Sequence, residues 1–254
     1  MISPVIINRL SLEQKTQMAE SWFELANPSH FWLRHKYYLL KKHYGQEFKN
    51  AEKIAEIGCG NGIFTEAMSS FSQKSIDGID LSENVLKMYK NPSGKIFLYN
   101  IEDKNPLLEN HYNLIFALDV LEHIKEEKKF LKAISWHLKP KGKLIINVPA
   151  NTRLYSKYDQ QLGHFRRYDI CSLSFILKKS DFNVSSHLYW GYSYLPLLFF
   201  RKWLVNFVPK SQIVKTGFKT NKLTNFLFSI ISRLDFPGSH KKPGASLLLL
   251  AQKK

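Results

Sequence analysis

The chain has 254 residues, 44% of them apolar and 23% charged, a composition that excludes a disordered chain and fits a protein that buries a core. Its two cysteines exclude a disulfide framework. Lys and Arg outnumber Asp and Glu by 37 to 21, and residues 181–254 alone hold 11 basic and 2 acidic residues. A basic surface suits nucleic acid, anionic lipid or an acidic substrate, and composition does not choose among them.

The N-terminal residues lack a basic start and a long apolar stretch, so we predict no secretory signal and a cytoplasmic protein. Ser11-Leu-Glu-Gln14 has the spacing of a capping box and predicts a helix running towards Pro28. A second, aromatic helix is expected from His30 to Leu40. Together they predict an N-terminal helical cap over residues 1–45, before a main domain over residues 46–254.

Short β-branched runs then alternate with helical stretches, the pattern of a mainly parallel sheet with helices on both faces. Strands are predicted at residues 53–57, 75–79, 95–99, 112–118, 143–148, 183–189 and 246–251, and helices at 63–70, 82–90, 122–137 and 171–179. The predicted fold class is therefore α/β, with a Rossmann-like seven-stranded sheet.

More than 50 residues separate the last two predicted strands, far more than a hairpin loop needs, so residues 190–243 are a predicted insertion. The insertion mixes aromatic and basic residues and has no uncharged apolar run long enough to span a bilayer. Extra core, a nucleic-acid surface and a membrane-facing amphipathic element all remain open. The last is favoured, because aromatic side chains beside Lys and Arg suit the headgroup region of an anionic membrane.

The first strand runs through Glu56 into three alternate glycines, Gly58, Gly60 and Gly62, and then into a helix. Glycines let the backbone approach a ligand, and the helix start offers free N–H groups. Ile63 stands where a dinucleotide fingerprint needs its third glycine, which argues against NAD. The loop therefore predicts a site for a small polar ligand other than a dinucleotide.

Two further strands deliver polar groups to the same edge of the predicted sheet. Asp80 ends the second strand, where a carboxylate can accept hydrogen bonds from both ribose hydroxyls of a nucleoside. Asp119, Glu122 and His123 follow the fourth strand. Open α/β sheets bind ligands at this carboxyl edge.

Four features in this order, the glycine loop, Asp80, the segment 118–123 and the segment 138–149, resemble the class I S-adenosylmethionine-dependent methyltransferases, in a type 11/12-like subgroup. The resemblance implies S-adenosylmethionine as cofactor, with the ribose on Asp80 and the adenine near Asn100, where the family often has Asp. The implied cofactor residues are Glu56, Gly58, Cys59, Gly60, Gly62, Asp80, Leu81, Asn100, Ile101, Glu102, Leu118 and Asp119.

A Gly-His-x-Arg-Arg-Tyr segment at residues 163–168 is similar to one found in subgroup members associated with lipid, polyprenyl or glycan modification. His164 is the predicted general base, with Tyr168 as a second catalytic candidate. His123, Arg166 and Arg167 are predicted to bind the substrate, the arginines through a phosphate or carboxylate. Structural roles for His164 and the two arginines remain open.

No metal site is predicted. Ubiquinone-biosynthesis O-methyltransferases have a pair similar to Glu122–His123, for which a divalent metal is one interpretation and a helix start with a buried histidine the other. The predicted function is O-methylation of a hydrophobic, lipid-linked, quinone-type or glycan-type acceptor, at the inner face of a membrane. An RNA-directed methyltransferase and a non-catalytic, cofactor-binding partner subunit are the alternatives. The predicted partners are a small-molecule or lipid-linked acceptor and an anionic membrane surface, with nucleic acid disfavoured.

Overall fold

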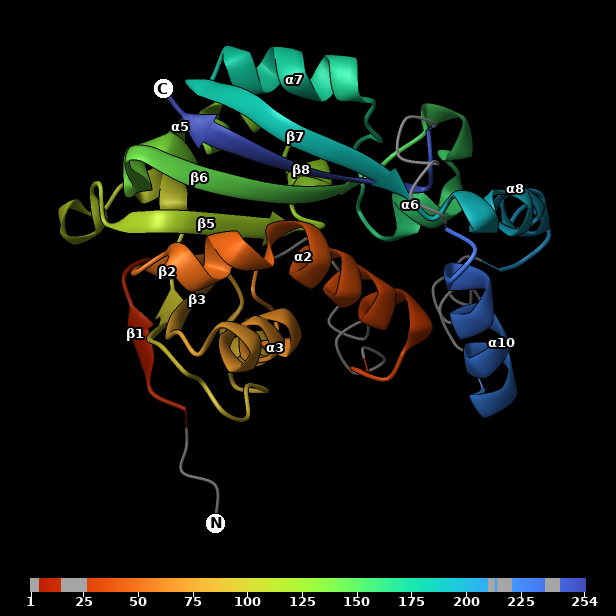
Figure 1. Cartoon of the computed structure of the whole chain (residues 1–254), viewed down its shortest axis with the longest axis horizontal. Coiled ribbons are helices and arrows are strands. Elements are labelled where there is room, and N and C mark those ends of the chain that lie inside the picture. Colours follow the sequence, from red (N-terminus) through yellow and green to blue (C-terminus); the bar gives the residue numbers. More distant parts are fainter. Residues whose placement is uncertain (1–4, 15–26, 210–212, 214–220, 236–242) are drawn as a thin grey trace.

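An eight-stranded sheet forms the centre of the computed structural model, which describes residues 5–14, 27–209, 213, 221–235 and 243–254 (Figure 1). The strand order is β1-β4-β3-β2-β5-β6-β8-β7. The strands are β1 (Ile7–Arg9), β2 (Ile54–Ile57), β3 (Ile76–Asp80), β4 (Ile96–Leu98), β5 (Tyr112–Leu118), β6 (Leu138–Pro149), β7 (Phe182–Trp190) and β8 (Ser246–Lys253). Strand β8 runs antiparallel to both β6 and β7, and the other pairs are parallel.

The predicted fold class is confirmed, but the predicted number of strands is wrong. The additional strand, β1, pairs with β4 at one edge of the sheet, in the register Ile7 to Ile96. Three residues are too few to show a strand periodicity, and their partner lies almost 90 positions away. The hydroxyl of Ser11 does not cap a helix but donates to Asp103 and accepts from the backbone N–H of Asn100. The rest of that predicted helix, residues 15–26, lies outside the described residues.

Helices cover both faces of the sheet, and the alternation along each strand sorts the core into two clusters. Ile54, Phe116 and Ile145 face α2 (Phe31–Asn50) and α3 (Ile63–Ser72). Their neighbours Ala55, Ile115 and Leu144 face α5 (Glu127–His137) and α7 (Ile170–Lys178). Because successive side chains of a strand point to opposite faces, both faces of this sheet need apolar residues.

The remaining helices are short, and some differ from the predicted ones. They are α4 (Glu83–Leu86), α6 (Lys157–Gln161), α8 (Leu195–Leu204), α10 (Lys222–Ser232), and the 3₁₀ turns η1 (Ile101–Asp103), η2 (Pro106–Leu108), η3 (Leu121–His123), η4 (Thr152–Leu154) and η5 (Tyr192–Tyr194). The helix predicted over 122–137 is divided into η3 and α5, and the predicted boundary between residues 45 and 46 falls inside α2.

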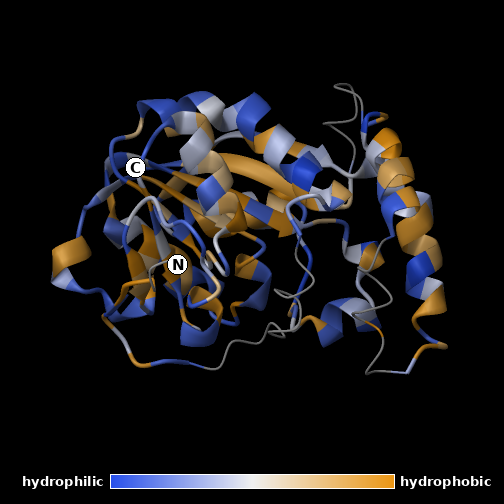
Figure 2. Cartoon of the chain, turned by 90° about the horizontal axis from the view of Figure 1, so that it is seen from below, coloured by the Kyte–Doolittle hydropathy of each residue, from blue (hydrophilic) through white to orange (hydrophobic). Residues whose placement is uncertain are grey.

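The insertion between β7 and β8 contributes η5, α8 and α10, and α10 packs beside α2 (Figure 1). Figure 2 shows hydrophobic residues along this helical part of the molecule. Both α8 and α10 expose large apolar side chains, among them Trp203 and Phe226.

On the other side of α2, the chain reverses its winding between β2 and β5. Such a switch point opens a crevice at the carboxyl edge of the strands.

Candidate functional site

The glycine loop joins β2 to α3 at this switch point. Gly58, Gly60 and Gly62 all have positive φ, at 69°, 55° and 83°. A Cβ on Gly62 would lie 2.2 Å from the Tyr89 ring, and one on Gly58 would lie 2.5 Å from Cγ2 of Val120. The loop therefore has neither the space nor the backbone conformation for side chains at these two positions.

Asp80, at the end of β3, is bonded directly to this loop. One carboxylate oxygen accepts from the N–H of Gly60 at 2.9 Å, and the other accepts from the N–H groups of Leu81 at 2.7 Å and Ser82 at 3.0 Å. Burial raises the pKa of Asp80, and these backbone donors oppose the rise. A carboxylate offers about four acceptor positions. Asp80 thus holds the loop in place and keeps acceptor capacity for a ligand.

Burial raises the pKa of two residues in this region, Glu56 in β2 and Cys59 between Gly58 and Gly60. Burial raises the pKa of Glu56 to about 8, against the opposing effect of the hydrogen bond that it accepts from the hydroxyl of Thr65. Burial also raises the pKa of the Cys59 thiol well above its ordinary value. Cys59 therefore packs as a small apolar residue and is not a nucleophile.

The segment after β4, predicted to hold the adenine, is engaged with its own neighbours. The side-chain oxygen of Asn100 accepts from the backbone N–H of Glu102 at 3.0 Å, which caps η1. Ile101 is buried in the core, and Glu102 forms an ion pair of 2.6 Å with Lys129. These contacts fix the shape of the segment, and its role towards adenine stays a prediction.

A buried polar chain, which sequence reasoning largely missed, closes the crevice beyond Asp119. The Lys36 ammonium forms an ion pair with Asp119, which also accepts from the Asn147 amide at 2.5 Å. The side-chain oxygen of Asn147 accepts a hydrogen bond from the Trp190 indole N–H at 2.9 Å. Lys36 could have been found, because it falls at helical spacing between the buried Leu33 and Leu40. Leu118, a predicted cofactor residue, instead lies in the core cluster under α2 and α3.

Glu122, His123 and His164 come together beside this chain. The rings of the two histidines are 4.7 Å apart, and Nε2 of His164 lies 4.0 Å from the Glu122 carboxylate. Among the described residues, neither the Glu122 oxygens nor the His123 nitrogens have a hydrogen-bond partner. Burial raises the pKa of Glu122 well above its usual range, and burial with the nearby His164 lowers the pKa of His123 to about 4.

The same three residues could hold a divalent cation, because one ligand atom from each lies within 4.8 Å of the others. Imidazole and carboxylate are common ligands of zinc and related metals, and three of them leave a coordination position open. A metal at Glu122 and His123 was one interpretation of the sequence, but His164 as the third ligand was not predicted. His164 is 41 positions after His123, on a different element, so no local spacing joins them.

His164 also has the surroundings of an oriented base. Its Nδ1 lies 3.3 Å from the carboxylate of Asp159, which in turn accepts from Nε of Arg167 at 2.7 Å. Burial pushes the pKa of Asp159 upward, but its contacts with His164 and Arg167 lower it overall. An ionised carboxylate on one ring nitrogen fixes the orientation of the imidazole and leaves the other nitrogen for proton transfer. Asp159 was not among the predicted site residues.

Three other predicted site residues form hydrogen bonds or ion pairs within the protein. The Tyr168 hydroxyl donates to Glu127 at 2.6 Å, and burial raises its pKa. Arg166 pairs with Glu127, and Arg167 pairs with Asp159 and donates to the carbonyl of Ala150 at 3.0 Å. The segment docks on the end of β6 through the bridge between Ala150 and Tyr168, and the side chains of Tyr168 and Arg167 are buried there. Their contacts with a substrate stay a prediction.

The sequence and the fold are similar to those of known proteins. Residues 28–187 match a family model described as a methyltransferase domain. A ubiquinone biosynthesis O-methyltransferase of Hydrogenovibrio crunogenus is 27% identical over 139 residues, which are 52% of this chain and 56% of that protein. The chain spans about half the length of the curated relatives that it matches.

Two solved structures share the fold. Phosphoethanolamine N-methyltransferase 2 of Haemonchus contortus, in complex with S-adenosyl-L-methionine, superposes with a TM-score of 0.57 at 19% identity, over 94% of this chain and 58% of that one. The cyclase SpnF superposes with a TM-score of 0.62 at 14% identity, over 96% and 97% of the two chains. At these identities the likeness is one of fold alone.

Proposed function

The chain belongs to the methyltransferase-domain family, and we propose that it is an S-adenosylmethionine-dependent methyltransferase that acts on an oxygen atom of a hydrophobic or lipid-linked acceptor. The observation that carries this proposal is the apolar surface of α8 and α10, which belongs to a strongly basic insertion beside the crevice. The relatives named as O-methyltransferases of ubiquinone biosynthesis support an oxygen acceptor.

The residues around the switch point fit the cofactor. Its amino-acid end would lie against the backbone at Gly58, Gly60 and Gly62, where side chains are excluded. Asp80 would accept from the ribose hydroxyls with the capacity that its backbone contacts leave free. When bound, the cofactor supplies a methyl group on a positively charged sulfur, so that a properly aligned oxygen can attack it. Alignment of two reactants can contribute about 7–11 kcal/mol to catalysis.

His164 is the proposed general base for the acceptor hydroxyl. It would take the proton on Nε2, while the carboxylate of Asp159 at Nδ1 stabilises the resulting imidazolium. His123 is less suitable, because a pKa of about 4 makes it a weak base near neutral pH. The Glu122 carboxyl, whose pKa burial raises well above its usual range, lies 4.0 Å from the same nitrogen of His164.

We expect His164→Ala to slow methyl transfer by about 10²- to 10⁴-fold, the usual contribution of a general base, while affinity for S-adenosylmethionine changes little. Rates are measured with methyl-labelled cofactor, and affinity by calorimetry. His187→Ala, on the edge strand β7, is the matched control and should keep the parental rate. Each assay is repeated with a chelator, because a metal bound by His164 would also depend on this residue. If His164→Ala transfers the methyl group at the parental rate, His164 is not the general base.

The acceptor class is inferred from the surface of the insertion. Trp203 on α8 is 57% exposed and Phe226 on α10 is 62% exposed. Residues 190–243 carry nine Lys and Arg but one acidic residue, Asp235. Exposed aromatic residues among cations suit the boundary between headgroups and hydrocarbon in an anionic membrane. Within the described residues, no helix has the length and apolarity needed to cross a bilayer.

We expect Trp203→Glu combined with Phe226→Glu to abolish flotation of the protein with vesicles that contain phosphatidylglycerol, because each change places a charge where the apolar face meets lipid. Phe175→Glu is the matched control, since Phe175 is 60% exposed but lies on α7, on the opposite face of the sheet. Equal flotation of both variants and the parent would contradict a membrane role for α8 and α10.

The acceptor itself is tested by offering methyl-labelled cofactor and separated lipid, RNA and small-molecule extracts. Label in the lipid fraction is the expected result. Label in RNA would support an RNA-directed methyltransferase instead, and its binding would weaken steeply with salt. Tight cofactor binding without label in any fraction would support a non-catalytic subunit.

A further inference from the structure

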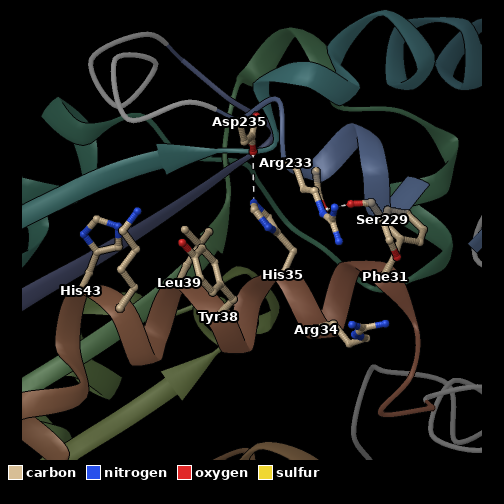
Figure 3. Close-up of a pocket in the computed structure, with 11 residues that line it drawn as sticks. Phe31, Arg34, His35, Tyr38, Leu39, His43, Ser229, Arg233 and Asp235 are labelled. Carbon is tan, nitrogen blue, oxygen red and sulfur yellow. Dashed lines mark hydrogen bonds and ion pairs between the residues drawn. The ribbon is translucent and has the colours of Figure 1, made fainter. Parts of the chain in front are cut away.

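A second cavity lies outside the crevice, between α2 and the C-terminal end of α10 (Figure 3). Its volume is about 460 Å³, within the range of small-molecule sites. Helix α2 separates it from the crevice: Lys36 is buried and reaches Asp119, whereas Arg34 and His35 line the cavity. The cavity therefore belongs to neither the proposed cofactor site nor the His164 cluster.

The cavity carries uncompensated positive charge. Arg34, Lys42 and Arg233 line it, and the described part of the chain places no carboxylate within 4.0 Å of these three cations. The one acidic residue of the lining, Asp235, is already bound to other groups of the protein. Its side chain is 3% exposed, lies 3.3 Å from Nε2 of His35, and accepts from the backbone N–H groups of Gly191 and Ser193. The charge of this lining is therefore complementary to that of an anion.

The walls of the cavity are fixed by contacts between elements far apart in the sequence. The His35–Asp235 pair joins α2 to the end of α10, and Figure 3 shows it at the back of the cavity. At the other end of the cavity the N–H of Phe31 donates to the Asn225 side chain at 2.7 Å, and the Phe31 ring lies 5.0 Å from that of Phe228. These contacts hold the two walls together before a ligand binds, whereas the exposed side chains of Arg34, Lys42 and Arg233 would be ordered by the ligand.

The chemistry of the lining favours a phosphate. Guanidinium groups match phosphate oxygens with paired hydrogen bonds, and two of the three cations of the lining are arginines, one from each wall. Next to Arg233, an apolar stripe is exposed by Leu223, Leu227 and Ile230 on α10 and by Leu234 in the turn that follows it. These residues recur every three or four positions and therefore share one side of the helix. An anionic head and a hydrocarbon tail would both find a partner here.

We propose that this cavity binds the phosphate group of an anionic lipid, with the hydrocarbon chains against the apolar stripe of α10. The site would hold the enzyme on the membrane in a defined orientation, whether or not the bound lipid is the molecule that is methylated. It differs from a general attraction to negative charge, because it depends on the cations that line this one cavity.

The test removes charge from the cavity and, separately, from a distant surface. Full-length parent, Arg34→Gln/Arg233→Gln and Lys128→Gln/Lys132→Gln are compared by flotation with phosphatidylcholine vesicles containing phosphatidylglycerol. Lys128 and Lys132 are exposed on α5, across the sheet from α2, so the control loses the same charge. We expect the cavity variant to partition about 30-fold more weakly, and the control to equal the parent. Equal partitioning of both variants would overturn the proposal.

Two further measurements identify the ligand and the state of the protein. Calorimetry with inorganic phosphate and with glycerol 3-phosphate, without vesicles, should give binding much weaker than that of vesicles. Leu227→Glu/Ile230→Glu should reduce flotation but leave this weak phosphate binding in place. Tight binding of free phosphate, with flotation insensitive to the stripe, would overturn the assignment to a lipid. Unchanged affinity of the cavity variant for S-adenosylmethionine shows that it is folded and separates this test from that of the methyltransferase function.

Discussion

Replacing Asp80 by Ala is expected to weaken the binding of S-adenosylmethionine by about 10²- to 10⁴-fold. The proposed loss is that of two hydrogen bonds to an ionised carboxylate, each contributing roughly 1.5–3 kcal/mol. The N–H groups of Gly60, Leu81 and Ser82 would also lose their acceptor, so the loop itself would be held less firmly. Calorimetry with the cofactor and with its demethylated product measures the effect.

Asp77→Asn is the matched control for this experiment. Asp77 lies on the same strand, but it accepts from the N–H of Lys95 and from the Tyr112 hydroxyl, away from the glycine loop. We expect it to bind the cofactor as the parent does. A melting curve of Asp80→Ala shows whether the variant is folded at the temperature of the assay. If folded Asp80→Ala protein binds the cofactor with the parental affinity, the assignment of the nucleoside to this carboxylate is wrong.

Gly62→Ala is expected to destabilise the protein by about 2–5 kcal/mol. A left-handed backbone costs a residue with a Cβ roughly 1–2 kcal/mol, and the overlap with the Tyr89 ring adds about 1–3 kcal/mol. For a chain of this size, that corresponds to a fall in Tm of roughly 4–20 °C. Thermal unfolding, followed by circular dichroism, measures the change.

Two variants separate the backbone cost from the steric one. Gly62→Ala combined with Tyr89→Leu makes room for the methyl group but keeps the left-handed backbone. Part of the stability that the double variant loses should then come from the smaller side chain at position 89, and not from overlap with a ring. Gly45→Ala is the matched control: Gly45 is helical, and its new Cβ would meet only the movable end of the Phe71 ring. We expect Gly45→Ala to change Tm little, because Ala is the better helix former. Equal Tm values for Gly62→Ala and the parent would contradict the geometry of the loop.

Local patterns predicted much of the fold. The strands from β2 to β8 were placed from β-branched runs, and the glycine loop from three alternate glycines, because both signals depend on residues next to one another in the sequence. Strand β1 was missed for the opposite reason, since it is defined by its pairing with β4. The division of one predicted helix into η3 and α5 was also missed, although both parts lie where a helix was expected.

The candidate site divides in the same way. Gly58, Gly60, Gly62 and Asp80 were identified as a set because each follows the end of a predicted strand, and parallel strands bring these ends to one edge. The pair of Asp159 with His164 was not foreseen, since nothing in the spacing says that the carboxylate turns towards the ring. Tyr168, Arg166 and Arg167 had the right chemistry for substrate contacts, but docking of their segment on β6 gave each an internal partner.

The sequence by itself determined the family, the order of the main elements and the residues at the glycine loop, because hydrophobic period, glycine placement and strand ends are local properties of a chain. Only the tertiary structure decided which charges are buried and which are paired. Lys36 meets Asp119 across 83 positions, and His35 meets Asp235 across 200. Such partners are chosen by the packing of α2 against the sheet and the insertion, and burial then sets the pKa of groups such as Glu122 and His123.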